Sequence, residues 1–201
     1  MAMNKGRLEA FSDGVLAIII TIMVLELRAP AGSDLESLRP LLPVFVSYVL
    51  SFIYVGIYWN NHHHFLRAAT RIDGRVMWAN LHLLFWLSMF PFATAWMGEH
   101  HDAATPVAMY GVMLMMAAIA WLPFQASLMR ASGSDWTLSR AVDPWGWKSV
   151  LPVVFYLTGI SLAFVNTWAA QAMYAAVAVM WFVPDRRIEH RIQDIAHHEQ
   201  A

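Results

Sequence analysis

The chain has 201 residues, of which 59% are hydrophobic and 13% are charged, and it contains no cysteine. Soluble domains carry about a quarter charged residues and about half apolar ones, so this composition indicates a membrane-embedded protein. The formal net charge of −1 provides no basic surface for nucleic acid, and we expect no nucleic-acid partner. Without cysteine the chain has no disulfide, no thiolate nucleophile and no cysteine-ligated metal.

The first apolar segment follows two basic residues near the N-terminus. Its uncharged part covers residues 14–25, and it reaches spanning length when residues 11–13 lie in the membrane with it. A secretory signal peptide is the alternative interpretation. We disfavour it because Asp13 stands at the head of the apolar run, and Glu26 and Arg28 stand just before the small-residue segment that would be cleaved.

Four longer stretches carry almost no charge. Apart from tyrosines, the only titratable groups between Arg39 and Arg67 are three consecutive histidines; residues 76–98 hold only His82, and residues 103–129 hold none. The last stretch, residues 149–184, is long enough for two spans joined by a turn. Asn166 and Thr167 lie near its midpoint, and their side chains compete with helical hydrogen bonds.

We therefore predict an all-α protein with six transmembrane helices in one domain over residues 1–184. The spans are expected at approximately 8–28, 38–62, 76–98, 104–128, 149–165 and 167–184. Prolines that interrupt the spans are Pro43, Pro91, Pro123 and Pro152. Residues 185–201 carry isoleucines at helical spacing beside charged residues, so we predict an amphipathic cytoplasmic tail.

The distribution of Lys and Arg orients the chain. With a cytoplasmic N-terminus, six spans leave only Arg28 and Arg39 outside. The cytoplasmic ones are Lys5, Arg7, Arg67, Arg71, Arg75, Arg130, Arg140, Lys148, Arg186, Arg187 and Arg191. Because cytoplasmic loops of membrane proteins are enriched in basic residues, we predict a multi-pass cell-membrane protein with both termini in the cytoplasm.

Two faces can be separated on the first span. At about 100° per residue, Phe11, Ile18 and Leu25 share one face, which Thr21 flanks, while Ser12 and Asp13 point away from it. An ionisable group such as Asp13 at the edge of an apolar zone needs a partner. The topology offers Asn60, Asn61, His62, His63, His64, Asn80 and His82 at its depth, and Arg7 on its own or a neighbouring helix. We favour a polar clamp that locks helix packing over catalysis.

The histidines suggest a metal site, but their spacing disfavours one. Three consecutive side chains of a helix point in directions about 100° apart and cannot share one ion. The sequence has no HExxH, GxSxG or phosphate-loop motif. We therefore expect no catalytic residue, no metal and no cofactor. The alternative is a histidine-containing membrane enzyme or a haem or metal protein that uses His63 and His82; a secondary transporter is disfavoured because no inverted repeat is visible.

Arg7 and Phe11-Ser12-Asp13 form the pattern R-x-x-x-F-S-D, which GVLAIIITIMVLEL follows. This pattern resembles the signature of the prokaryotic branch of the lysosomal potassium channel family, transmembrane protein 175. The stretches YWNNHHHFL and WANLHLLFWLSMFPFATAWMGEH, in the second and third predicted spans, are similar to that family as well. The resemblance covers roughly the first half of the chain.

The resemblance implies a potassium-selective, leak-type cation channel, not an enzyme. It implies a homotetramer of six-span subunits in the lipid bilayer, with the first helices lining the pore and potassium as the permeant ion. By position in the motif, Ile18 would form the hydrophobic constriction, Thr21 a hydroxyl layer and Leu25 a further apolar ring. The residues implied to position the pore helix are Arg7, Phe11, Ser12, Asp13, His63 and Asn80.

Overall fold

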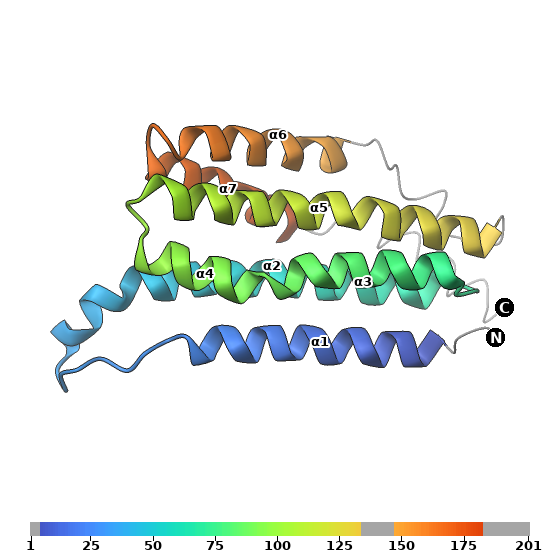
Figure 1. The fold of residues 1–201 in the computed structure, drawn as a ribbon, viewed down its shortest axis with the longest axis horizontal. Helices are drawn as coiled ribbons and strands as arrows, with labels where there is room; N and C mark the ends of the chain where they lie inside the picture. Colours follow the sequence, from blue (N-terminus) through green and yellow to red (C-terminus); the bar gives the residue numbers. More distant parts are fainter. Residues whose placement is uncertain (1–4, 134–146, 183–201) are drawn as a thin grey trace, which may run out of the picture.

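The computed structural model describes residues 5–133 and 147–182, and every regular element in those residues is helical. The elements are α1 (Lys5–Leu25), the 3-10 helix η1 (Leu35–Leu41), α2 (Leu42–Ala68), α3 (Gly74–Ser88), α4 (Phe90–Glu99), α5 (Ala104–Ser132), α6 (Trp147–Leu162) and α7 (Thr167–Phe182). With α3 and α4 in line, they form six rods along the long axis of the molecule (Figure 1). The predicted all-α class with six helices is confirmed, and the predicted tail at 185–201 lies outside the described residues.

Four segments are long and apolar enough to cross a bilayer: α1, η1 with α2, α3 with α4, and α5. Helices α6 and α7 have 16 residues each, which is roughly 24 Å of helix. Their connection lies at the predicted turn. The Oδ1 atom of Asn166 accepts a hydrogen bond from the backbone N–H of Ala169 at 3.1 Å, and this bond caps the start of α7.

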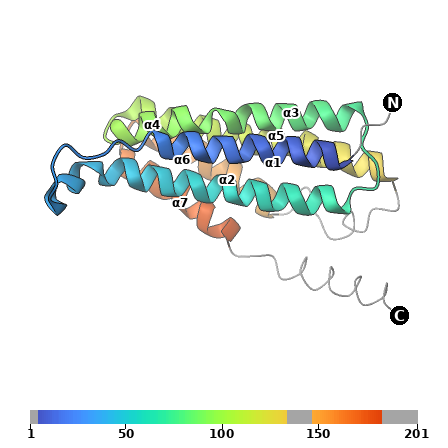
Figure 2. The ribbon, with the colours of Figure 1, turned by 90° about the horizontal axis from the view of Figure 1, so that it is seen from below.

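Helix α1 lies at one edge of the bundle. It packs against α2, α3 and α4, while α5, α6 and α7 lie on the far side of those helices (Figure 1). The turned view shows α1 between α2 and α3, with one of its faces directed away from the bundle (Figure 2). The side chains of α1 that pack inward are Leu8, Ser12, Leu16, Ile19 and Met23. Their spacing of three and four residues gives one continuous buried face.

The segment predicted as a single third span is divided at Met89. The N–H of Met89 bonds to the carbonyl of Trp86, three residues back, at 3.3 Å, and α4 begins directly after it. Pro91 explains the division, because a proline ring lacks an N–H donor and clashes with the carbonyl four residues before it. Pro43 has no such effect, since it lies in the first turn of α2, where that N–H is not needed.

The connection from α1 to α2 lies at the end of the bundle opposite Lys5. Asp34 caps η1 there, accepting hydrogen bonds from the hydroxyl and from the backbone N–H of Ser37. These bonds favour the charged carboxylate and lower the pKa of Asp34 below its ordinary value. At the same end Arg28 reaches Glu99 of α4 at 4.0 Å.

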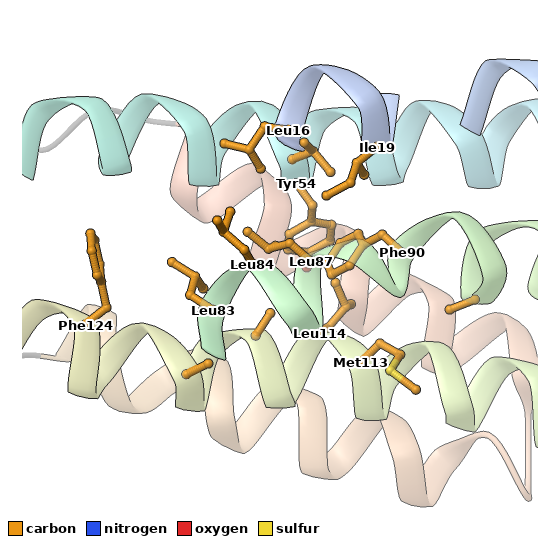
Figure 3. Packing of buried hydrophobic residues seen from close by; sticks show 14 of the residues in the cluster. Leu16, Ile19, Tyr54, Leu83, Leu84, Leu87, Phe90, Met113, Leu114 and Phe124 are labelled. Carbon is orange, nitrogen blue, oxygen red and sulfur yellow. The ribbon is translucent and has the colours of Figure 1, made fainter. Parts of the chain in front are cut away.

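The core lies where α1, α2, α3 and α5 meet α4. Leu16 and Ile19 of α1 lie beside Tyr54 of α2 and above the leucines of α3 (Figure 3). The buried hydroxyls are paired: Tyr54 donates to the backbone carbonyl of Tyr174 at 2.6 Å, and Ser51 bonds to Tyr110 at 2.9 Å. Such pairing is required because a buried unpaired hydroxyl is costly.

Glycines allow the outer helices to approach closely. A Cβ atom at Gly111 of α5 would lie 2.1 Å from the Tyr174 hydroxyl and 2.8 Å from Ile160. A Cβ at Gly159 of α6 would lie 2.4 Å from the same tyrosine ring. Small residues at such contacts are how helices in lipid gain close packing.

We expect Gly111→Ala to destabilise the bundle by about 1–3 kcal/mol, the usual cost of overpacking. The methyl group would meet Tyr174 and Ile160, both packed against the core, so relief requires backbone movement. The measurement is thermal unfolding of the purified protein in detergent. Gly74→Ala is the control, because its Cβ meets nothing within 4 Å; equal melting temperatures for the two variants would contradict the prediction.

Candidate functional site

The outward face of α1 carries the residues predicted to line a pore. Phe11, Ile18 and Leu25 are 52%, 59% and 75% exposed, and Thr21 is exposed between them. The opposite face is the buried one that packs against α2, α3 and α4. Helical spacing predicts a stripe formed by Phe11, Ile18, Thr21 and Leu25, and in the single chain this whole stripe is exposed.

Thr21 is the one hydroxyl on this stripe. Its Oγ1 atom donates to the backbone carbonyl of Ala17 at 2.8 Å. The hydrogen of the hydroxyl is thus engaged within the helix, and the oxygen lone pairs are left on the exposed face. At this position the stripe presents an acceptor of hydrogen bonds or a weak ligand for a cation.

A buried chain of polar side chains holds the other face of α1. Ser12 donates to the carbonyl of Leu8 at 2.9 Å and accepts from the amide nitrogen of Asn80 at 3.0 Å. The amide oxygen of Asn80 bonds to Nε2 of His62 at 2.7 Å. Ser12 and Asn80 are fully buried, and His62 is 2% exposed. Three membrane-spanning helices, α1, α3 and α2, are thereby joined at one level.

Two further contacts join α1 to α2 beside this chain. The indole N–H of Trp59 donates to Oδ1 of Asp13 at 3.1 Å, and Nδ1 of His63 lies 3.0 Å from Oε1 of Glu9. The rings of Trp59 and His63 stack, with centroids 6.1 Å apart. Both carboxylates of α1 thus face partners on α2, on the side away from the exposed stripe.

Lys5 fixes the first turn of α1. Its Nζ atom donates to the carbonyls of Arg67 and Ala69, at 2.7 and 3.0 Å. These carbonyls belong to the C-terminal end of α2, where the helix leaves carbonyl groups unpaired and where a positive charge is favoured.

The six residues predicted to position the pore helix are not one network. Ser12 and Asn80 bond to each other, while Asp13 and His63 each bond to a different residue. Arg7 and Phe11 lie on the surface and line a groove of about 220 Å³ between α1 and α3. Among the described residues Arg7 has no ion-pair partner.

Sequence reasoning did not name Trp59 as a partner, and it named His62 only as one of several polar groups at the depth of Asp13. The resemblance implied His63 and Asn80 as members of the positioning network, but it is His62 that bonds to Asn80. The buried residues of α2 include Tyr54 and Val55, and His62 lies eight residues after the first and seven after the second, so the buried face continues through His62. That signal was present in the sequence. The Trp59 contact carried no comparable signal, because Asn, His and Arg are the more usual partners for a carboxylate.

The histidines do not gather around one point. No group of three or more His, Asp or Glu residues that could hold a metal ion is found in the part of the chain that the structure describes. His62 stacks on Phe124 with ring centroids 4.9 Å apart, and His82 accepts a hydrogen bond from the indole of Trp86 at 3.0 Å. Each of these histidines has a packing or hydrogen-bonding partner instead.

Comparisons with known proteins agree with this arrangement. The model of the family described as endosomal/lysosomal potassium channel TMEM175 matches residues 7–91. A potassium channel of Chryseobacterium sp. (strain P1-3) is 50% identical over 192 residues, which cover 96% of this chain and 100% of the relative. The human endosomal/lysosomal proton channel TMEM175 is 37% identical over 87 residues, 36% of this chain and 17% of its own.

A solved structure is similar over nearly the whole chain. The crystal structure of a lysosomal potassium-selective channel TMEM175 homolog from Chamaesiphon minutus has a TM-score of 0.75 and 28% sequence identity. The match covers 89% of this chain and 96% of that one.

We expect Asn80→Ala to loosen α1, because it leaves Ser12 and His62 without their shared partner in an apolar interior. Each buried polar group left unpaired costs about 1–3 kcal/mol. Asn61→Ala is the control, since among the described residues that half-buried side chain has no partner; we expect about 0.5 kcal/mol or less from it. Thermal unfolding in detergent measures both, and a control as destabilised as Asn80→Ala would contradict the assignment.

Proposed function

The chain belongs to the endosomal/lysosomal potassium channel TMEM175 family, and from that premise we propose that it is a leak-type potassium channel that works as a homotetramer with α1 of each subunit lining the pore. The family is one of ion channels and not of enzymes, so the histidine-containing enzyme is not favoured. The observation that carries the proposal is the exposed stripe of α1, which stands opposite a face held by buried polar bonds.

In a tetramer, the exposed stripe of α1 would face the same stripe of the other subunits. In a single chain Ile18 and Leu25 are among the more exposed apolar side chains of α1. Rotational symmetry around an axis parallel to α1 brings one copy of each residue from every subunit to the same height. Ile18, near the middle of the helix, then forms an apolar collar, and such a collar restricts flow because water leaves it readily.

Thr21 lies three residues beyond Ile18 on the same stripe. Because its hydrogen is donated to Ala17, its oxygen faces outward as an acceptor. Four such oxygens are suited to hold a cation or the water around it directly beside the apolar collar. We propose that the collar limits hydration and that the Thr21 layer contributes to the discrimination between potassium and sodium.

The basic residues support a cytoplasmic location for the N-terminal end of α1. Antiparallel packing brings these basic residues to that end of the bundle: Lys5, Arg7, Arg67, Arg71, Arg75 and Arg130. The opposite end holds Arg28 and Arg39, both paired with glutamates. By the positive-inside rule we propose a cell-membrane protein whose N-terminus lies in the cytoplasm.

The direct test is ion flux. Protein reconstituted in liposomes under a potassium gradient should release potassium faster than empty liposomes, and its mass in nanodiscs should correspond to four chains of 22.8 kDa. A parallel measurement with a pH-sensitive dye separates potassium from proton conduction. A stable monomer, or flux of protons alone, would overturn the proposal.

We expect Ile18→Asn to raise the current several-fold and to lower the ratio of potassium to sodium permeability, because a polar collar stays hydrated. Ile18→Ala should act in the same direction by widening the collar, and Thr21→Ala should lower the ratio with less leak. Val24→Ala is the matched control: Val24 is 43% exposed on α1 but lies about 120° around the helix from Ile18. Reversal potentials under bi-ionic conditions measure the ratio of potassium to sodium permeability. If Ile18→Asn changed neither the current nor this ratio, Ile18 would not be the constriction.

A further inference from the structure

Two polar side chains lie exposed on membrane-spanning helices outside the site described above. Asn60 of α2 is exposed and has no hydrogen-bond partner among the residues that the structure describes. His82 of α3 is exposed, and within the described part of the chain it bonds through Nε2 alone, which accepts the indole N–H of Trp86 at 3.0 Å. In the neutral imidazole the other ring nitrogen, Nδ1, then carries the proton and is a free donor.

Lipid is an unsuitable neighbour for both groups. Asn60 lies eight residues before the C-terminal end of α2, and His82 lies eight residues after the N-terminal end of α3, which is roughly 12 Å in each case. Helix α2 has 27 residues, about 40 Å, and exceeds a hydrocarbon core of about 30 Å by roughly 5 Å at each end. Asn60 and His82 therefore lie within the core, where unpaired polar groups are costly and normally face protein or water.

The two groups lie at the same height. The bond between His62 and Asn80 sets the register of α2 against α3, which run in opposite directions. Asn60 is two residues before His62 and His82 is two residues after Asn80, so both are displaced by roughly 3 Å towards the same end of the bundle.

They lie on opposite flanks of the subunit. Figure 2 shows α1 between α2 and α3, with its outward face towards the viewer. On α2, Trp59 and His63 turn towards α1, and Asn60 lies about 100° beyond Trp59, away from α1. On α3, Met77 and Leu81 border α1, and His82 lies about 100° beyond Leu81, away from it.

We propose that neighbouring subunits meet with the α2 flank of one against the α3 flank of the next, and that Asn60 accepts a hydrogen bond from Nδ1 of His82 of the partner subunit. This pairing rests on the homotetramer of the proposed function. Rotation about a pore axis parallel to α1 preserves height and brings unlike flanks together, which is the heterologous contact of a closed ring. The chemistry is complementary, because Asn60 offers an amide oxygen and His82 offers an N–H donor.

The α3 flank also has the shape of a surface that receives another chain. The groove between α1 and α3 opens just below the level of His82, and its lining is mostly apolar. The facing flank of α2 carries exposed apolar side chains, Val46 at 61% and Val49 at 38%. A second copy would cover the apolar surface and the polar pair together.

Cysteine cross-linking tests the pairing, because the native chain has no cysteine. A chain carrying Asn60→Cys and His82→Cys, treated in membranes with a short bismaleimide, should give covalent dimers, trimers and tetramers on a denaturing gel. Each single-cysteine chain alone should stay monomeric on that gel. Co-expression of the two single-cysteine chains with different tags should give mixed dimers and nothing larger.

The matched control moves one cysteine further along the rod that α3 and α4 form. Phe92 is 54% exposed and lies ten residues, roughly 15 Å, beyond His82, so Asn60→Cys with Phe92→Cys should not cross-link. Absence of cross-linking for the Asn60 and His82 pair in a protein that is tetrameric and conducts potassium would overturn the pairing and leave the proposed function standing. A monomer by mass would overturn both.

A second measurement concerns the bond itself. Asn60→Leu and His82→Leu should each reduce the tetrameric fraction in dilute detergent, and the double variant should lose no more than the worse single variant, since one shared bond is removed once. Fully additive losses would show that the two side chains do not bond to each other and would overturn the proposal.

Discussion

The fixed point of this structure is the buried bond between Ser12 of α1 and Asn80 of α3. In a membrane, apolar helices have little hydrophobic reason to prefer one neighbour over another, so hydrogen bonds and close packing decide how they are arranged. Asn80 has both an amide donor and an amide oxygen, and it uses the first on α1 and the second on His62 of α2. That amide therefore couples the rotation of α1, and with it the direction of Ile18 and Thr21, to both α2 and α3.

Hydropathy was sufficient to predict the all-α class and the approximate bounds of the helices. Charged residues are costly in lipid, so the membrane-spanning segments appear in the sequence as long uncharged runs. The turn at Asn166 was predictable because its side chain caps the next helix. The division at Met89 required more, because Pro91 could have kinked one helix or separated two. Likewise Asp13 was predictably turned away from the stripe, but its partner Trp59 depends on how α1 leans against α2. That is set by packing and not by local sequence.

The two halves of the chain carry different tasks. Residues of α1, α2 and α3 supply the bonds of Ser12 and Asp13 that hold α1, and the family model matches this region. Helices α5, α6 and α7 meet through glycines against Tyr174 and through paired tyrosine hydroxyls.

Lys5, Ser12 and Asp13 tie the first half of α1 to α2 and α3, whereas its second half is held by apolar side chains and one weak contact from Thr94 to the sulfur of Met23. Helix α1 is therefore anchored in its first half, and a tilt of the helix has its pivot near Ser12. Ile18 lies roughly 9 Å from that pivot along the axis, and Leu25 lies roughly 20 Å from it. Any tilt about Ser12 moves Leu25 about twice as far as Ile18, so the proposed pathway would change width more at its Leu25 end than at Ile18.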